Sequence, residues 1–278
     1  MGSTAPLLRC FRGQWYGLMG PAPMVTGERT VTTDRQAMQE QDSTRWQWKW
    51  PGWGRVARLV AWSAAGLVGV SLLWVLAYAI LPVPGTPLMM IRTFQGQGWE
   101  KDWQPLERIS PHLVRAVIAA EDTRFCAHAG VDWGAVEQAL TRNEQGGTLR
   151  GGSTISQQVA KNAFLWPDRS WTRKGIEFWF TLLVENIWSK RRIAEIYLNI
   201  VEWAPGVYGA EAAARHWFGK PALDLTSREA ALLAAILPSP LKWKANPPGR
   251  YVASRAGTLQ KRMEIVRRDA LADCVLGD

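Results

Sequence analysis

The sequence has few of the residues that build metal centres, with three histidines and three cysteines in 278 residues. Cys10, Cys126 and Cys274 lie far apart and form no CxxC pair, and the histidines form no HxxxH pair. Structural zinc sites use closely spaced cysteine and histidine ligands. We therefore expect no structural metal site of nitrogen and sulfur ligands, and the cysteines say little about the compartment.

A long basic run is also missing, although the formal net charge is +9. The excess of lysine and arginine is spread over the whole chain. Because nucleic-acid binding usually concentrates basic residues in a patch or stripe, we expect no nucleic-acid partner. An anionic membrane surface and a phosphate-bearing substrate fit this charge equally well.

Charge is absent altogether from residues 59–81, a run of 23 positions. A helix of about 20 apolar residues crosses the hydrocarbon core of a bilayer. The run starts too far from the N-terminus for an ordinary cleaved signal peptide. A buried core helix is the alternative, but a continuous apolar run of this length favours a transmembrane helix, which we place at residues 56–82.

The basic residues around this run predict its orientation. Lys49, Arg55 and Arg58 precede it, and residues 82–91 contain no basic residue. The positive-inside rule then places residues 1–55, interpreted as a poorly ordered tail, in the cytoplasm and the C-terminal domain outside. The tryptophans just before the run either sit at the headgroup level or belong to a short amphipathic peptide or a disordered segment: Trp46, Trp48, Trp50 and Trp53.

The remainder of the chain predicts a mainly α-helical domain. Residues 83–105 are interpreted as a linker because their first part is rich in proline and glycine. The helical domain is expected over residues 106–255, followed by a C-terminal helical tail over residues 256–278. Thr226 and Glu229 have the spacing of a capping box and indicate the start of one of its helices.

An acidic pair, Glu121 and Asp122, ends the first helix expected in this domain. Ser110 and Pro111 are typical of its start, and apolar residues spaced by three and four share a face with Glu121. Partial burial and the negative end of the helix dipole both raise the pKa of a carboxylate. A general base that works near neutral pH needs such a raised pKa. The alternative is a solvated acid at the helix end, paired with Arg124.

The stretch GGSTISQQVAKN, residues 151–162, predicts an anion site at the start of a helix. Ser153, Gln157 and Lys161 are spaced i, i+4, i+8 and share one face. Free backbone N–H groups, a hydroxyl and a lysine on one side attract an anion. The glycine count and the lysine position differ from those of a Walker loop. The alternative is a polar, solvated helix face capped by a serine.

A second acid lies among cations in RSWTRKGIEFWF, residues 169–180. Arg169, Arg173 and Lys174 precede Glu177 closely. Because Arg173 and Glu177 are spaced i, i+4, a plain intrahelical ion pair is one interpretation. The other is a carboxylate held among cations beside a phosphate group.

Four motifs in this order resemble the peptidoglycan glycosyltransferases, glycosyltransferase family 51, over about residues 85–250. The chain matches EDxxFxxHxGxD at residues 121–132, GGSTxxQQxxKN at 151–162, RKxxE at 173–177 and KxxIxExYLN at 190–199. Four motifs in the right order are far more specific than any one of them. The resemblance implies a mainly α fold: a lysozyme-like helical glycosyltransferase domain with a small membrane-proximal jaw, preceded by one transmembrane helix.

The resemblance also implies a reaction. Members of the family polymerise lipid II into β-1,4 glycan strands and release undecaprenyl pyrophosphate, with inversion at the anomeric carbon. Glu121 resembles the general base that takes the proton of the acceptor 4-hydroxyl, and Asp122 supports the site. Glu177 resembles the second essential acid, beside the leaving pyrophosphate. Whether Glu177 binds a metal, holds the cations or assists departure is left open by the sequence.

Further residues are assigned to substrate binding by the same resemblance. Ser153, Lys161 and Arg169 match positions that contact the pyrophosphate. The other matching or cleft-shaping residues are Asp122, Arg124, Gln157, Gln158, Asn162, Arg173 and Lys174. Residues 142–150 look like a mobile loop over the cleft, and a divalent cation, Mg or Mn, is the expected cofactor.

The family context also predicts location and partners. It implies a single-pass protein of the bacterial inner membrane, with the N-terminus in the cytoplasm and the catalytic domain in the periplasm. Its partners would be lipid II, the growing glycan strand, the membrane and other proteins of cell-wall synthesis.

Three other functions fit parts of the sequence. A bifunctional penicillin-binding protein would explain an SxxK match at Ser239–Lys242, but the chain has no KTG and only 36 residues follow. A lytic transglycosylase or muramidase could use two carboxylates on a lysozyme-like lobe, yet would not need a pyrophosphate-binding end. A membrane-tethered scaffold would tolerate substitutions in the motifs.

Overall fold

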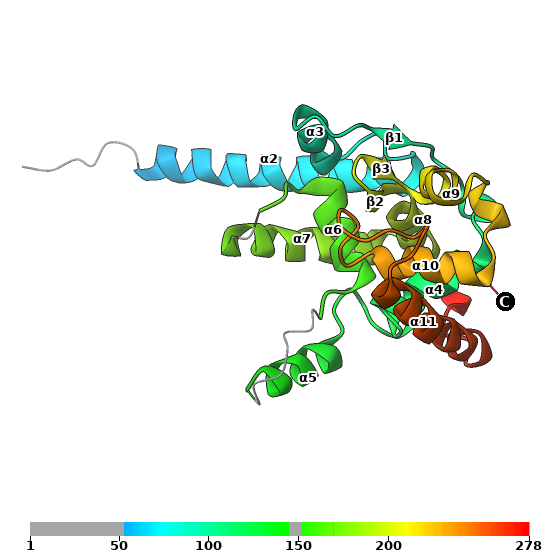
Figure 1. The fold of residues 1–278 in the computed structure, drawn as a ribbon. Coiled ribbons are helices and arrows are strands. Elements are labelled where there is room, and N and C mark those ends of the chain that lie inside the picture. Colours follow the sequence, from blue (N-terminus) through cyan, green and yellow to red (C-terminus); the bar gives the residue numbers. More distant parts are fainter. Residues whose placement is uncertain (1–52, 145–151, 169, 278) are drawn as a thin grey trace, which may run out of the picture. The chain divides into compact units, whose positions relative to one another are not determined.

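The computed structural model describes residues 53–144, 152–168 and 170–277, and these are mainly helical (Figure 1). The long and medium helices are α2 (Trp53–Ile80), α4 (Pro111–Glu121), α5 (Trp133–Glu144), α6 (Ile155–Phe164), α7 (Trp171–Ile187), α8 (Lys190–Ile200), α9 (Ala210–Phe218), α10 (Ser227–Ile236) and α11 (Arg250–Arg268). The short elements are α3 (Pro87–Phe94), α12 (Asp273–Leu276), the 3-10 helices η1 (Leu106–Arg108), η2 (Phe125–Ala127) and η3 (Ala222–Asp224), and the strands β1 (Glu100–Lys101), β2 (Glu202–Ala204) and β3 (Val207–Tyr208).

Contacts divide the chain into two units, Met1–Val56 and Ala57–Asp278. Of the first unit only residues 53–56 are described, as the first turn of α2. The predicted N-terminal tail and the tryptophans before Trp53 therefore lie outside the described residues. The mainly helical prediction for the rest of the chain is confirmed.

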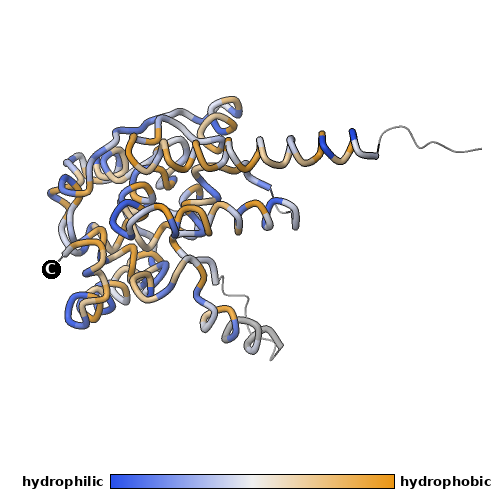
Figure 2. The backbone as a smooth tube through the Cα atoms, turned by 180° about the vertical axis from the view of Figure 1, so that it is seen from behind, coloured by the Kyte–Doolittle hydropathy of each residue, from blue (hydrophilic) through white to orange (hydrophobic). Residues whose placement is uncertain are grey.

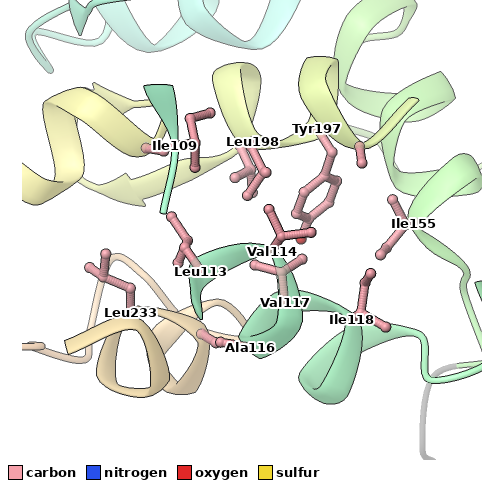
Figure 3. Close-up of a cluster of buried hydrophobic side chains, with 14 of the residues drawn as sticks. Ile109, Leu113, Val114, Ala116, Val117, Ile118, Ile155, Tyr197, Leu198 and Leu233 are labelled. Carbon is pink, nitrogen blue, oxygen red and sulfur yellow. The ribbon is translucent and has the colours of Figure 1, made fainter. Parts of the chain in front are cut away.

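Helix α4 lies in the middle of the hydrophobic core. Six of its eleven residues are buried, and it packs against α10 and α11 on one side. On the other side Ile155 of α6 and Tyr197 and Leu198 of α8 close over it (Figure 3). Burying each large aliphatic side chain contributes about 1.5–3 kcal/mol. The packing therefore holds the last residue of α4, Glu121, in a fixed place.

Predicted helix starts are found where the capping residues indicated them, with one correction. Ser110 caps α4 ahead of Pro111, and the Thr226–Glu229 capping box begins α10. In α6 the capping residue is Thr154 and not Ser153. The Thr154 hydroxyl accepts the Gln157 N–H at 3.2 Å, and Gln157 accepts the Thr154 N–H at 3.1 Å. This box leaves the side chain of Ser153 exposed, one residue before the cap.

A small sheet in the order β1-β3-β2 adds to the expected helices. β1 pairs with β3 in parallel and β2 pairs with β3 antiparallel. Strands of two or three residues are too short to give an alternating sequence pattern. Gly206 is required here because its φ is +74° and a Cβ would lie 2.4 Å from the Gly98 carbonyl oxygen.

The prediction of a linker over residues 83–105 is wrong. This segment contains α3, whose N-cap Thr86 accepts the N–H of Met89 at 3.3 Å. Val83 and Met89 are fully buried. Thr-Pro is a start signal for a helix, so the proline and glycine residues bracket a short helix that belongs to the domain.

The boundary predicted between residues 255 and 256 is also wrong, because it cuts α11. This helix runs unbroken from Arg250 to Arg268 and buries Val252, Leu259, Met263 and Val266 on one face. Beyond it, Cys274 in α12 forms a disulfide with Cys126 of η2, with the two Cα atoms 5.7 Å apart. The C-terminal segment is therefore part of the domain.

Helix α2 is the one helix in the described part of the chain that is long and apolar enough to cross a membrane. The mean hydropathy of its most apolar 18-residue window is 2.1, only 11% of that window is buried, and Figure 2 shows apolar colours along most of the helix. Residues 53–68 are all exposed. The C-terminal part packs on the domain: the indole N–H groups of Trp179 and Trp188 donate to Ser71 Oγ (3.2 Å) and the Val75 carbonyl (3.0 Å). These features fit a single-pass membrane protein better than a core helix.

Candidate active site

Glu121, the last residue of α4, lies half-buried in the wall of a cleft. Burial raises the pKa of its carboxyl group, and this effect exceeds the opposing effects of a hydrogen bond from Gln158 and the charges of Arg255 and Lys161. Gln158 Nε2 donates to Glu121 Oε2 at 2.8 Å. A carboxylate with a raised pKa is suited to accept a proton.

Asp122 fastens the end of α4 to the start of α6. Its buried carboxylate accepts the N–H of Ile155 at 3.0 Å and lies 3.0 Å from His128 Nε2. These contacts fit the predicted supporting role. Arg124 does not pair with Glu121, because its Nη1 donates to Asp132 Oδ1 at 3.0 Å.

Ser153, Gln157 and Lys161 line one pocket of about 140 Å³, as their spacing predicts. The amide oxygen of Gln157 is used in the capping box of α6. Burial lowers the pKa of Lys161, while the charge of Glu177 raises it. A partly desolvated lysine that neighbouring acids help to keep charged is a strong anion-binding group.

Glu177 lies buried on α7 between two cations. Arg173 Nη1 donates to Glu177 Oε2 at 2.9 Å, and Lys174 contacts the other oxygen. The predicted ion pair is therefore present, and the same pocket also contains Lys161. Three cations facing one carboxylate leave an excess of positive charge in this pocket, which favours an anion.

Three pockets that share residues form one groove. The pocket at Glu121, about 120 Å³, meets the cationic pocket at Ser153. The cationic pocket shares Lys161 and Arg173 with a third pocket of about 440 Å³. Apolar residues line much of the third pocket, together with Asn162 and Asp168: Leu88, Leu165, Trp166 and Pro167. An acid, a cationic segment and a mostly apolar pocket thus follow one another along the groove.

Two predicted features fall wholly or partly outside the described residues. Arg169 is one of them. The loop expected over residues 142–150 is the other: α5 extends to Glu144, so its first residues are helical, and residues 145–150 are not described.

Two residues of the site were not predicted from the sequence. Arg255 comes from α11, and its charge lowers the pKa of Glu121. No local pattern marks it, because it lies far along the chain and only the packing of α11 on α4 brings it near. Tyr197 is part of the fourth motif, but its link to the site depends on a hydrogen bond to Gln158, whose Oε1 lies 3.4 Å from the tyrosine hydroxyl.

The side chains of the groove do not fit a resident divalent cation. Within residues 53–144, 152–168 and 170–277, no three His, Cys, Asp or Glu side chains are grouped to hold a metal. Both oxygens of Glu177 contact cations, and Asp122 is bound by backbone and histidine. Magnesium sites normally combine one or two free carboxylates with water and substrate phosphates.

A helical domain with a proton-accepting acid and an anion-binding segment in one groove fits the class of group-transfer enzymes with an anionic leaving group. A family described as transglycosylase matches residues 88–266. The chain is 58% identical to the biosynthetic peptidoglycan transglycosylase of Rhodospirillum centenum over 80% of this chain and 97% of that protein. It is 54% identical to that of Caulobacter vibrioides (75% and 91%) and 52% identical to that of Pseudomonas putida (75% and 89%). The chain belongs to the transglycosylase family.

Proposed function

We propose that this protein is a peptidoglycan glycosyltransferase that polymerises lipid II into β-1,4 glycan strands and releases undecaprenyl pyrophosphate. The family membership and the relatives' names support a biosynthetic activity. The observation that carries the proposal is the single groove in which Glu121 faces the cations Lys161, Arg173 and Lys174.

In the proposed reaction Glu121 is the general base. It accepts the proton of the 4-hydroxyl of the acceptor sugar while that oxygen attacks the anomeric carbon of the donor. The bond from this carbon to the diphosphate oxygen breaks as the new glycosidic bond forms, so an α-linked donor gives a β-linked product with inversion. The raised pKa of Glu121 makes its carboxylate a stronger proton acceptor than an exposed glutamate.

The cationic pocket is proposed to bind the leaving diphosphate. Lys161, Arg173 and Lys174 place positive charge where negative charge develops, and such preorganised charge is commonly worth several kcal/mol in the transition state. We assign Glu177 the role of holding these cations in place, because its two oxygens contact Arg173 and Lys174 and its charge raises the pKa of Lys161. The mostly apolar third pocket, which begins at Lys161 and Arg173, suits the first part of the lipid chain.

The divalent cation remains a prediction. Because both oxygens of Glu177 contact cations, we propose that any such ion is bound by the diphosphate oxygens of the substrate and arrives with it.

The membrane placement is proposed from α2 and α7. The freely exposed part of α2, residues 53–68, would lie in the bilayer. Helix α7 packs beside the C-terminal part of α2 and exposes Trp171, Phe178, Trp179 and Leu182, which suits the outer lipid layer. The Cys126–Cys274 disulfide suits an oxidising compartment. We propose the bacterial inner membrane, with the N-terminus in the cytoplasm and the domain in the periplasm.

The test is polymerisation of lipid II by the purified full chain in detergent or vesicles. Glu121→Gln is expected to abolish strand formation, because the amide cannot accept the proton. Its circular dichroism and thermal unfolding should match those of a folded protein. Robust polymer from this variant would refute the assignment of the base.

Finished glycan strands, used as a second substrate, distinguish synthesis from the lytic alternative. Incubation with finished glycan strands should leave their length unchanged if the enzyme only synthesises. Shortened strands would favour lysis, for which a cationic diphosphate pocket has no use.

A further inference from the structure

Two consecutive hydrogen bonds connect a buried tyrosine with the candidate base. The hydroxyl of Tyr197 lies 3.4 Å from Gln158 Oε1, and Gln158 Nε2 lies 2.8 Å from Glu121 Oε2. The three residues come from three helices, α8, α6 and α4. The connection is therefore made by the fold and by no single sequence motif.

The tyrosine and the Glu121 carboxylate together favour one orientation of the glutamine amide. An amide has a donor side and an acceptor side, and a half-turn of the group exchanges them. With the Tyr197 hydroxyl donating to Oε1, the NH₂ group faces the Glu121 carboxylate. In the reversed orientation the amide oxygen would face the carboxylate oxygen, and the two acceptors would repel each other.

Tyr197 is suited to this role because it is a fixed and permanent donor. It is 1% exposed, and Figure 3 shows its ring reaching from α8 toward Val114 and Val117 of α4. Burial, aided by the charge of Glu121, raises its pKa well above the ordinary value, so the hydroxyl keeps its proton at any working pH. A fixed hydroxyl that keeps its proton can donate to Gln158 Oε1 and so supports the orientation in which the NH₂ group faces Glu121.

The other groups that act on Glu121 work through charge. Arg255 of α11 and Lys161 of α6 lower the pKa of Glu121, and Asp122 at the end of α4 raises it. Their effects remain when the Gln158 amide turns. The hydrogen bond from Gln158 to the carboxylate is thus the feature that Tyr197 can strengthen, by holding and polarising the amide.

We propose that Tyr197 is a positioning residue, which acts through Gln158 to orient and polarise the carboxylate of Glu121. The kinetic part of this inference rests on the proposed glycosyltransferase function. The structural part, the control of Glu121 by Tyr197, stands independently of the reaction.

The first experiment compares Tyr197→Phe with Tyr208→Phe in the full chain. Tyr208 is a matched control, because it is also fully buried and its hydroxyl bonds a carboxylate, that of Glu202, which does not line the pockets of the groove. In Tyr197→Phe the acid limb of kcat/KM is expected to move up by about 0.5–1 pH unit, because a stabilising bond to the ionised form is weakened. We expect kcat at neutral pH to fall roughly tenfold with little change in KM.

A second measurement needs no activity. Titration of the Glu121 carboxyl group, followed by ¹³C NMR with Glu121→Gln as the assignment control, should give a higher pKa in Tyr197→Phe than in wild type. Gln158→Leu should raise it as well, and the double variant Tyr197→Phe/Gln158→Leu should match Gln158→Leu alone, because the tyrosine acts only through the glutamine.

The outcomes separate the two proposals. A higher Glu121 pKa in Tyr197→Phe, with Tyr208→Phe unchanged, supports the inference even if wild type makes no polymer. An unchanged Glu121 pKa in Tyr197→Phe, or an equal shift in Tyr208→Phe, overturns it even if wild type polymerises lipid II. Additive shifts in the double variant would also overturn it.

Discussion

Glu121 and Lys161 act on each other's charge from two helices of one groove. The positive charge of Lys161 lowers the pKa of Glu121, and the carboxylate of Glu121 raises the pKa of Lys161. Burial opposes both effects, because it disfavours the charged form of each group. Each group therefore favours the ionised form of the other, beside the larger effects of Gln158 and Arg255 on Glu121 and of Glu177 on Lys161. Disturbing either one is expected to change the pH dependence of the enzyme.

The first prediction concerns the pH dependence of activity and stability at Glu121. Activity needs the carboxylate, so kcat/KM should fall as pH drops through the raised pKa of Glu121, at a higher pH than for an ordinary glutamate. The contribution of Glu121 to the free energy of unfolding should change with pH in the opposite direction. Between the ordinary and the raised pKa the folded protein holds a proton that the unfolded chain has lost, so the group's contribution to stability falls as pH rises.

Glu121→Gln separates these effects. Its free energy of unfolding should exceed that of wild type above the raised pKa, because a buried charge is removed, and the difference should vanish at acidic pH. Denaturant unfolding over about pH 4–8 measures this. If Glu121→Gln were less stable than wild type by the same amount at every pH, the prediction would be contradicted.

The second prediction concerns Lys161 and the leaving diphosphate. Lys161→Ala should weaken binding of a pyrophosphate-bearing donor analogue about 10–100-fold, the value of a charged hydrogen bond in a partly buried site. Lys220→Ala is the control, because Lys220 pairs with Glu229 and does not line the groove. Isothermal titration with a phosphoglycolipid analogue gives both affinities. Equal affinities of the two variants would count against the diphosphate pocket.

Local signals predicted much of the fold and of the site. The caps at Ser110 and Thr226, the helical spacing that ends at Glu121 and the RKxxE cluster depend on residues within a few positions of each other, and the structure has them in place. The uncharged run of α2 was equally visible. In each case the physical cause lies in neighbouring residues, so the sequence contains it.

Long-range contacts were beyond sequence reasoning. Arg255 affects Glu121 only because α11 packs on α4. Cys126 and Cys274 are 148 positions apart, and no spacing rule pairs them. The helix α3 was hidden because proline and glycine indicate linkers as readily as helix ends. These features depend on the tertiary fold.

The third prediction concerns the Cys126–Cys274 disulfide. Cys126 lies in η2, close after Asp122, so the bond joins the C-terminal segment to the loop behind the candidate base. Cys274→Ser should lower the free energy of unfolding by about 2–4 kcal/mol, and Tm by about 5–15 °C. Thermal unfolding with and without reductant checks this. Reductant should lower the Tm of wild type and leave that of Cys274→Ser unchanged. If reductant also lowered the Tm of the variant, the reductant-sensitive stability would not come from the Cys126–Cys274 bond.

The fourth prediction concerns Glu177 and the divalent cation. If Glu177 serves to hold cations, Glu177→Gln should leave unchanged the Mg or Mn concentration that gives half-maximal rate, while the maximal rate falls. Because Glu177 raises the pKa of Lys161, its loss should also move the alkaline limb of the rate to lower pH. Glu185→Gln is a matched control: Glu185 is on the same helix and pairs with Lys190 outside the groove. A marked rise in the half-maximal metal concentration for Glu177→Gln alone would instead make Glu177 a metal ligand.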